Sequence, residues 1–276
     1  MTNDVPDAID EWERRVAADA EQIPRLRENP PQDDHYESRA ADFRPGRRPS
    51  IEMPLVEQHA RPDDVWLDIG AGGGRFAVPI AEQVRHVIAL DPSAAMRTTM
   101  DAAMAETGVL NVDAREGRWP VDGWSEDVDV SLASHVLYDE ANITAFLDAM
   151  ERHTRRRCIV ILSDRSRGAN LNPLWELVHG EPRASLPAMP EFMAVLAARG
   201  VEPELETLAV SQGEPVPLDR ACDTARRFLW LQPGTEKDQR MCALVEERYG
   251  VGDGLAQLPA GLGAIGVVNW APPSTP

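Results

Sequence analysis

Residues 68–74, Asp-Ile-Gly-Ala-Gly-Gly-Gly, form the segment of the sequence with the clearest chemical potential. The segment follows an apolar run at 65–67 and precedes residues 75–85, whose apolar side chains have helical spacing. Glycines let a loop turn tightly and let a ligand approach the backbone without meeting a Cβ atom. We therefore expect this loop to bind a nucleotide-like ligand.

A second acidic residue follows the next apolar run. Asp91 lies 21 residues after Gly70, at the end of the run 87–90, and Pro92 and Ser93 come directly after it. At this distance a carboxylate can accept both ribose hydroxyls of an adenosine, in a dinucleotide site or in another adenosine site. Ser93 is expected to cap a helix whether or not a ligand binds.

The elements that must position these residues follow from the apolar pattern. Short apolar runs predict strands, and apolar side chains three and four residues apart predict helices. We expect strands at 65–69, 87–90, 109–113, 128–133, 158–162, 204–212 and 261–270, and helices at 7–28, 50–60, 75–85, 93–106, 140–153, 170–180, 189–199, 218–231 and 235–249. Strands alternating with helices between 64 and 164 predict a parallel sheet covered on both faces, with ligands at the carboxyl ends of its strands.

Two further strand ends supply candidates. The third strand is followed by Glu-Gly-Arg-Trp-Pro at 116–120, and the fourth by Ser134 and His135. Trp119 can pack on a planar ligand or fill space beneath a loop. His135 is the candidate catalytic residue, because histidine titrates near neutral pH and can act as a general base; the alternative is a supporting position beside the ligand.

The charge balance excludes several classes of protein. The 276 residues include 28 basic and 46 acidic ones, a formal net charge of −18. Because Lys237 is the only lysine, no G-x-x-x-x-G-K-[ST] phosphate loop exists, and a pyridoxal enzyme would have to use that residue. The negative charge and the 5% aromatic content argue against a nucleic-acid partner.

Other compositional features point to a cytoplasmic protein without a metal centre. No run approaches 18 apolar residues, and the first residues are polar and acidic, so neither a membrane span nor a signal peptide is expected. Cys158, Cys222 and Cys242 show no C-x-x-C spacing and are expected to be reduced core thiols rather than metal ligands.

The spacing of the glycines separates two classes of ligand. The dinucleotide fingerprint G-x-G-x-x-G fails from Gly70, because position 75 is arginine. From Gly72 it is met only in the form G-x-G-x-x-A, with Gly74 and Ala77, which places the turn inside the start of the helix. The better description is D-x-G-x-G-x-G, beginning at Asp68.

This D-x-G-x-G-x-G pattern resembles the first motif of the class I S-adenosylmethionine-dependent methyltransferases, over about residues 60–165. The resemblance implies S-adenosylmethionine as the cofactor, with Asp68 orienting its methionine end. The backbone of Gly70, Ala71 and Gly72 would hold the amino-acid group. Asp91 would bind the ribose, and the run that begins with Pro92 resembles the D-x-S-x-x-M segment of the family.

The third strand end departs from the family. Many members have Gly-Asp-Ala there, whose aspartate bonds the adenine amino group, whereas this chain has Glu116, Gly117 and Arg118. We expect the adenine contact to pass to the backbone of Arg118 and Trp119, or to the Glu116 side chain. Ser134 completes the expected cofactor-binding residues. The Asn-Pro-Pro-Tyr type of motif found in nucleic-acid methyltransferases is absent from the segment that follows the fourth strand. Its absence favours the small-molecule branch of the family.

The resemblance also implies an α/β fold of the Rossmann-like, doubly wound type. We expect a seven-stranded, mostly parallel sheet whose antiparallel last strand lies at 263–271, together with helical lid segments. The expected domains are an N-terminal helical lid segment at 1–50 and a methyltransferase domain at 51–276, with lid insertions at about 166–187 and 214–256.

The expected activity is methyl transfer to a small-molecule acceptor by in-line displacement, which needs mainly alignment of the nucleophile and exclusion of water. Two alternatives stay open. One is an NAD-type oxidoreductase that uses the register beginning at Gly72. The other is a catalytically inactive scaffold that binds the cofactor. The identity of the acceptor and the oligomeric state do not follow from the sequence.

Overall fold

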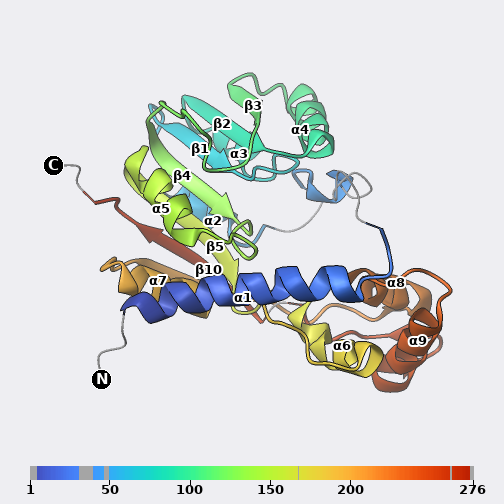
Figure 1. Cartoon of the computed structure of the whole chain (residues 1–276). Helices are drawn as coiled ribbons and strands as arrows, with labels where there is room; N and C mark the ends of the chain where they lie inside the picture. The colour runs from blue at the N-terminus through green and yellow to red at the C-terminus, as the bar shows by residue number, and fades with distance from the viewer. Residues whose placement is uncertain (1–4, 31–39, 47–49, 167, 262, 274–276) are drawn as a thin grey trace.

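The computed structural model describes residues 5–30, 40–46, 50–166, 168–261 and 263–273. Its main sheet has seven strands in the order β3-β2-β1-β4-β5-β10-β6 (Figure 1). The strands are β1 (Val65–Ile69), β2 (His86–Asp91), β3 (Val112–Glu116), β4 (Val128–Ser134), β5 (Thr154–Ser163), β6 (Glu204–Ala209) and β10 (Ala264–Trp270).

The strand directions confirm the predicted fold class. β1 pairs in parallel with β2 and β4, β2 with β3, and β4 with β5, whereas β10 is antiparallel to both β5 and β6. The chain builds one half of the sheet outward from β1 to β3 and then starts the other half with β4, beside β1. In register, Ile69 lies between Leu90 and Ala133. The carboxyl ends of these strands thus meet at the switch in strand order, where open α/β sheets bind ligands.

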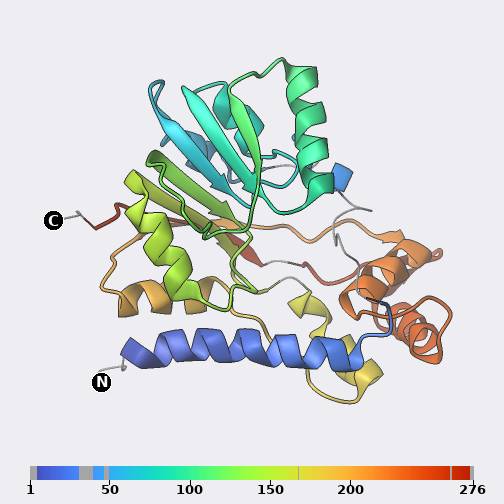
Figure 2. The same ribbon diagram turned by 45° about the horizontal axis from the view of Figure 1, so that its top comes forward.

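Helices cover both faces of the sheet, as Figures 1 and 2 show. One face carries α2 (Met53–Glu57), α3 (Ala77–Ala81) and α4 (Ala94–Thr107), and the other carries α1 (Val5–Leu26), α5 (Ile143–Arg152) and α7 (Met189–Ala198). Successive strand residues alternate between the two cores, so that Leu67 and Ile69 pack on one side and Trp66 on the other. Because both faces are buried, the strands are nearly continuous apolar runs in the sequence.

A smaller hydrophobic core lies beside the main one. It joins η2 (Ala169–Leu171, a short 3-10 helix), α6 (Asn172–His179), α8 (Leu218–Phe228) and α9 (Glu236–Tyr249) to residues of a three-stranded sheet. That sheet consists of β7 (Val216–Pro217), β9 (Leu255–Ala256) and β8 (Gly250–Gly252), in this order. A second short 3-10 helix, η1 (Ala40–Phe43), contacts α4. α1 links the cores, because Trp12 packs in the main one and Ile23 in the smaller one (Figure 2).

Two of the expected elements are placed wrongly by the sequence pattern. The helix expected from Ser50 begins only at Met53, because the Ser50 hydroxyl oxygen accepts a hydrogen bond from Nε of Arg75 at 2.8 Å instead of capping the helix. The third strand is β3, three residues later than the expected 109–113. Leu110 is 96% exposed, and the Asn111 side-chain amide donates to the Ala81 carbonyl at 2.8 Å, so both belong to the preceding loop.

Within the described ranges, no helix is long and apolar enough to cross a membrane. The same part of the chain contains no group of three or more His, Cys, Asp or Glu side chains placed to hold a metal ion. The cysteines are unpaired thiols, with Cys158 and Cys222 buried and Cys242 partly exposed.

Candidate functional site

The glycine loop follows β1 and is held against the end of β2. The backbone N–H groups of Gly70 and Ala71 both donate to the carbonyl oxygen of Leu90, at 2.8 and 3.0 Å. Gly70 and Gly72 have φ angles of 70° and 57°, in the left-handed region that glycine adopts readily. The loop therefore folds back over the end of the sheet before α3 begins.

Gly70 is also a point of close approach between two loops. A Cβ atom at this position would lie 2.3 Å from Cγ1 of Val136, in the loop that follows β4. The absence of a side chain at Gly70 lets the loops after β1 and β4 pack directly on each other. The two strand ends consequently form one site.

Gly70→Ala should lower the free energy of unfolding by about 2–4 kcal/mol, whereas Gly72→Ala should lower it by about 1–2 kcal/mol. Both positions have a positive φ, but a Cβ atom at Gly72 would meet only Sδ of Met96, at 3.8 Å. Denaturant unfolding of the two variants measures the difference. Equal losses would contradict the packing of Val136 on Gly70.

Asp68, near the end of β1, is a buried carboxylate that is only partly hydrogen-bonded. Its side chain is 3% exposed, and the backbone N–H of Ala77 donates to it, but Oδ2 has no hydrogen-bond partner among the described residues. Burial, and to a smaller extent the negative charge of Asp91, raise the pKa of Asp68 to about 7. A cationic ligand group beside Oδ2 would relieve both effects.

Asp91 ends β2 and organises the loop. Its Oδ2 accepts a hydrogen bond from the Gly72 N–H at 2.8 Å, and its Oδ1 accepts one from the Ser93 N–H at 2.9 Å. Each carboxylate oxygen can accept more than one hydrogen bond, so a ligand hydroxyl can bind beside each backbone donor. Ser93 caps α4 as predicted, because its hydroxyl oxygen accepts from the Met96 N–H.

The third strand end contributes Arg118 and Trp119. Trp119 is 3% exposed and its indole N–H donates to the carbonyl oxygen of Phe146 at 3.2 Å, so the ring is held in the core while it borders the cleft. Arg118 is exposed at the rim. Glu116 does not line the cleft, because its carboxylate pairs with Arg97 at 2.9 Å.

The fourth strand end contributes Ser134 and His135. The backbone N–H of His135 donates to the Ile161 carbonyl at 2.9 Å, which extends the pairing of β4 with β5 by one residue. The φ angle of His135 is 57°, a conformation that residues with side chains rarely adopt. Its Nδ1 lies 2.9 Å from the hydroxyl oxygen of Tyr138. The backbone turn and this hydrogen bond together fix the imidazole ring.

The site residues predicted from the sequence all line a single cleft of about 190 Å³. They are Asp68, Gly70, Ala71, Gly72, Asp91, Pro92, Arg118, Trp119, Ser134 and His135. Sequence reasoning missed Phe43, Arg75, Phe76, Met96 and Phe146, which also line the cleft. Met96 lies in the motif after Asp91 and could have been found there, whereas Phe43 of η1 belongs to no motif.

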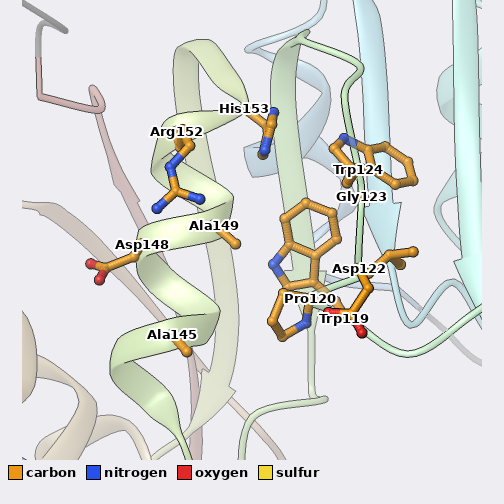
Figure 3. Close-up of a pocket in the computed structure, with 11 residues that line it drawn as sticks. Trp119, Pro120, Asp122, Gly123, Trp124, Ala145, Asp148, Ala149, Arg152 and His153 are labelled. Atoms are coloured by element: carbon orange, nitrogen blue, oxygen red, sulfur yellow. The ribbon is translucent and has the colours of Figure 1, made fainter.

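A second, larger cavity of about 380 Å³ also borders Trp119 (Figure 3). Arg152 and His153, at the end of α5, lie on one side of it, and Trp124 lies on the other. The glycine loop, Asp68 and Asp91 do not reach this cavity. The chemistry of the strand ends therefore assigns the candidate ligand site to the smaller cleft.

A comparison with protein-family models agrees with this geometry. Residues 67–157 match the model described as a methyltransferase domain. These residues, about a third of the chain, are similar to a methyltransferase domain. The domain runs from β1 into β5 and holds every predicted site residue.

Solved structures share the methyltransferase fold over a larger part of the chain. A candidate methyltransferase from Bacillus halodurans C-125 aligns over 80% of this chain and 98% of its own, with a TM-score of 0.57 and 16% identity. The YcgJ protein from Bacillus subtilis aligns over 79% of this chain and 96% of its own, with a TM-score of 0.54 and 15% identity. At these identities the likeness shows the fold.

One curated relative matches a shorter segment. An uncharacterised protein from Haemophilus influenzae is 33% identical over 96 residues, which is 35% of this chain. The matched segment spans about a third of that relative's length, 34%.

Proposed function

We propose that this chain is an S-adenosylmethionine-dependent methyltransferase that acts on a small-molecule acceptor. The observation that carries the proposal is the pair of buried carboxylates Asp68 and Asp91, at the ends of neighbouring strands around the glycine loop. An ammonium group fits the unpartnered Oδ2 of Asp68, and a pair of hydroxyls fits Asp91. S-adenosylmethionine carries both groups, in its amino acid and its ribose.

The remaining cofactor contacts follow from the other strand ends. Because Glu116 is paired with Arg97 and lies outside the cleft lining, we assign the adenine contact to the backbone of Arg118 and Trp119. The Gly70–Gly72 backbone would hold the amino-acid group. Ser134 would complete the pocket at the end of β4.

The chain's own residues would act by positioning and by excluding water. The bound cofactor supplies a methyl group on a positively charged sulfur. Phe43, Phe76 and Phe146 give the cleft apolar walls, and Asp68 and Asp91 fix the two ends of the cofactor within it. An acceptor held in line with the methyl carbon then needs little further assistance, because alignment itself removes a large part of the barrier.

The charge of the site favours a small neutral or cationic acceptor. Four acidic side chains (Asp68, Asp91, Asp139 and Glu140) line the cleft against two arginines (Arg75 and Arg118), and the chain carries a formal net charge of −18. Polyanions such as nucleic acids bind through arginine and lysine side chains that neutralise phosphates, and a negative surface repels them.

We also propose that the segment at 1–50 acts as a lid. Phe43 lines the cleft, and its carbonyl oxygen would be 2.9 Å from a Cβ atom at Gly73, so η1 touches the glycine loop. Among the described residues, the insertions at 166–187 and 214–256 contribute none to the cleft lining. The two insertions pack on the second half of α1, so we propose that they hold this part of the lid segment in place.

Calorimetry with S-adenosylhomocysteine, the product form of the cofactor, tests the proposed function. We expect binding at micromolar concentration and no binding of NADH. NADH binding without S-adenosylhomocysteine binding would support the oxidoreductase instead. Incubation with tritiated S-adenosylmethionine and a panel of small amines and phenols then separates an active enzyme, which labels an acceptor, from an inactive scaffold, which binds without transfer.

Binding of S-adenosylhomocysteine should release a proton near pH 6. Burial raises the pKa of Asp68 to about 7, and a bound ammonium group favours its ionised form, so the carboxyl must lose its proton on binding. The affinity should therefore fall as the pH is lowered below about 7, approaching tenfold per pH unit. Calorimetry in buffers of different ionisation enthalpy measures the released proton. Asp68→Asn should bind more weakly and without this release; proton release by Asp68→Asn equal to that of the wild type would contradict the assignment.

A further inference from the structure

A chain of hydrogen bonds leads from the cleft into the core. Nδ1 of His135 lies 2.9 Å from the hydroxyl oxygen of Tyr138, which in turn lies 2.6 Å from the hydroxyl oxygen of Ser163. The Ser163 hydroxyl donates to the carbonyl oxygen of Arg165 at 2.7 Å. Tyr138 and Ser163 are 6% and 0% exposed, so solvent competes little for these bonds.

The donors in this chain can be assigned one after another. A carbonyl oxygen only accepts, so the single hydroxyl proton of Ser163 points to Arg165. Ser163 must then accept from Tyr138, which uses the only hydroxyl proton of Tyr138. The Tyr138 oxygen also accepts from the backbone N–H of Ser163, at 2.9 Å. Towards His135 the Tyr138 oxygen can therefore only accept, and Nδ1 of His135 must carry a proton.

We propose that Tyr138 and Ser163 are positioning residues that hold neutral His135 with its proton on Nδ1, so that Nε2 is the general base that receives the acceptor's proton. In a neutral imidazole, a proton on one nitrogen leaves a lone pair on the other. His135 lines the cleft, and its backbone is fixed by the hydrogen bond to Ile161. The proposal rests on the proposed function, and it narrows the acceptor to a compound whose nucleophilic atom carries a proton, such as a hydroxyl or an amine.

The proposed step balances without a further reactant. The lone pair of the acceptor's oxygen or nitrogen forms the new bond to the methyl carbon, and the electrons of the broken sulfur–carbon bond return to sulfur. The proton of the acceptor atom passes to Nε2, which gives an imidazolium whose Nδ1–H still donates to Tyr138. Release of that proton to solvent restores the neutral ring.

Long-range proton–nitrogen NMR spectra of protein labelled with 15N-histidine test the tautomer directly. The chain has 6 histidines, and the His135 signals are assigned by their absence from the His135→Asn variant. At a pH where the ring is neutral, we expect Nδ1 to be protonated and Nε2 to be unprotonated. A wild-type ring with its proton on Nε2 would overturn the proposal, because that nitrogen could not accept a proton.

Ser163→Ala is the decisive variant. The Tyr138 hydroxyl loses its acceptor and becomes able to donate to Nδ1, so the tautomer ratio should shift towards protonated Nε2 by at least about fivefold, the factor that one hydrogen bond supplies. Tyr138→Phe, which removes the partner of Nδ1 altogether, should also shift the ratio away from the wild type. An unchanged ratio in both variants would overturn the positioning role.

Ser131→Ala is the matched control. Ser131 is 0% exposed on β4, the strand that precedes His135, but its hydroxyl bonds to Thr154 at 2.6 Å and lies outside the hydrogen-bond chain that leads to His135. It should leave the tautomer unchanged, and a shift as large as that of Ser163→Ala would contradict a specific relay. All three variants should keep the wild-type affinity for S-adenosylhomocysteine. A wild-type protein that shows the expected tautomer but binds no S-adenosylhomocysteine would refute the proposed function and leave the assignment of donors intact.

Discussion

Asp91→Ala should weaken the binding of S-adenosylhomocysteine by about 100-fold or more. The substitution removes the proposed acceptor of two ribose hydroxyls and also leaves the backbone N–H groups of Gly72 and Ser93 without their carboxylate. Hydrogen bonds to a charged group contribute about 1.5–3 kcal/mol each, and 1.4 kcal/mol corresponds to a factor of ten in affinity. Loss of the two ribose contacts alone therefore accounts for the expected effect.

Glu116→Ala is the control for this experiment. Glu116 is the residue in register with Asp91 on the neighbouring strand, so it carries the same charge at the same end of the sheet. Its carboxylate pairs with Arg97 and does not line the cleft. Calorimetry should give an affinity within about threefold of the wild type, as expected for an exposed ion pair. Unchanged affinity in Asp91→Ala, or equal losses in the two variants, would contradict the ribose assignment.

The part of the fold that the sequence predicts best is the part buried on both faces. β2 and β5 contain uninterrupted apolar runs, at 87–90 and 158–162, and β1 and β4 are mostly apolar, because their residues alternate between two cores and both cores are apolar. β3 lies at the edge of the sheet and carries half-buried polar residues, Asp113 and Arg115 among them, so its pattern is weak and its predicted position was three residues early.

The small sheet of β7, β9 and β8 was beyond prediction for a different reason. Strands of two and three residues cannot show an alternating pattern, and their pairing joins residues 216–217 to 255–256, across α8 and α9. The contribution of Phe43 to the cleft is likewise a contact between segments that are distant in sequence. Neither feature leaves a local signal.

The candidate site likewise contains residues that local sequence patterns predict and residues that depend on contacts distant in sequence. Asp68, the glycines and Asp91 could be predicted because each follows its strand at a fixed spacing, and the ends of neighbouring parallel strands must meet. The partners of His135 could not be found in this way. Tyr138 lies in a loop and Ser163 ends the next strand, 25 residues later, and their contact depends on the register of β4 with β5. Sequence patterns identify the residues at strand ends, whereas the pairing register of the strands determines which of their side chains are in contact.

His135→Asn should lower kcat by about 10²–10⁴-fold, the usual contribution of a general base, while the affinity for S-adenosylhomocysteine stays within about threefold of the wild type. Asparagine is the appropriate replacement, because it tolerates the positive φ of 57° at this position and its amide can still donate to the Tyr138 oxygen. The variant therefore removes the lone pair of Nε2 and little else. Rates are measured with tritiated S-adenosylmethionine and the acceptor identified from the panel of amines and phenols.

His153→Asn provides the comparison that gives this result its meaning. His153 is a second partly buried histidine, but it lines the larger cavity of Figure 3 and its Nδ1 lies 3.4 Å from Asp127, away from the cleft. Its replacement should leave kcat within about twofold, as for a surface substitution away from the reacting atoms. If His135 is the general base, kcat should fall in His135→Asn and not in His153→Asn, and the cofactor affinity of His135→Asn should be unchanged. If His135→Asn instead weakened the binding of S-adenosylhomocysteine and kept kcat, His135 would be a cofactor-positioning residue, and methyl transfer in this site would proceed by alignment alone.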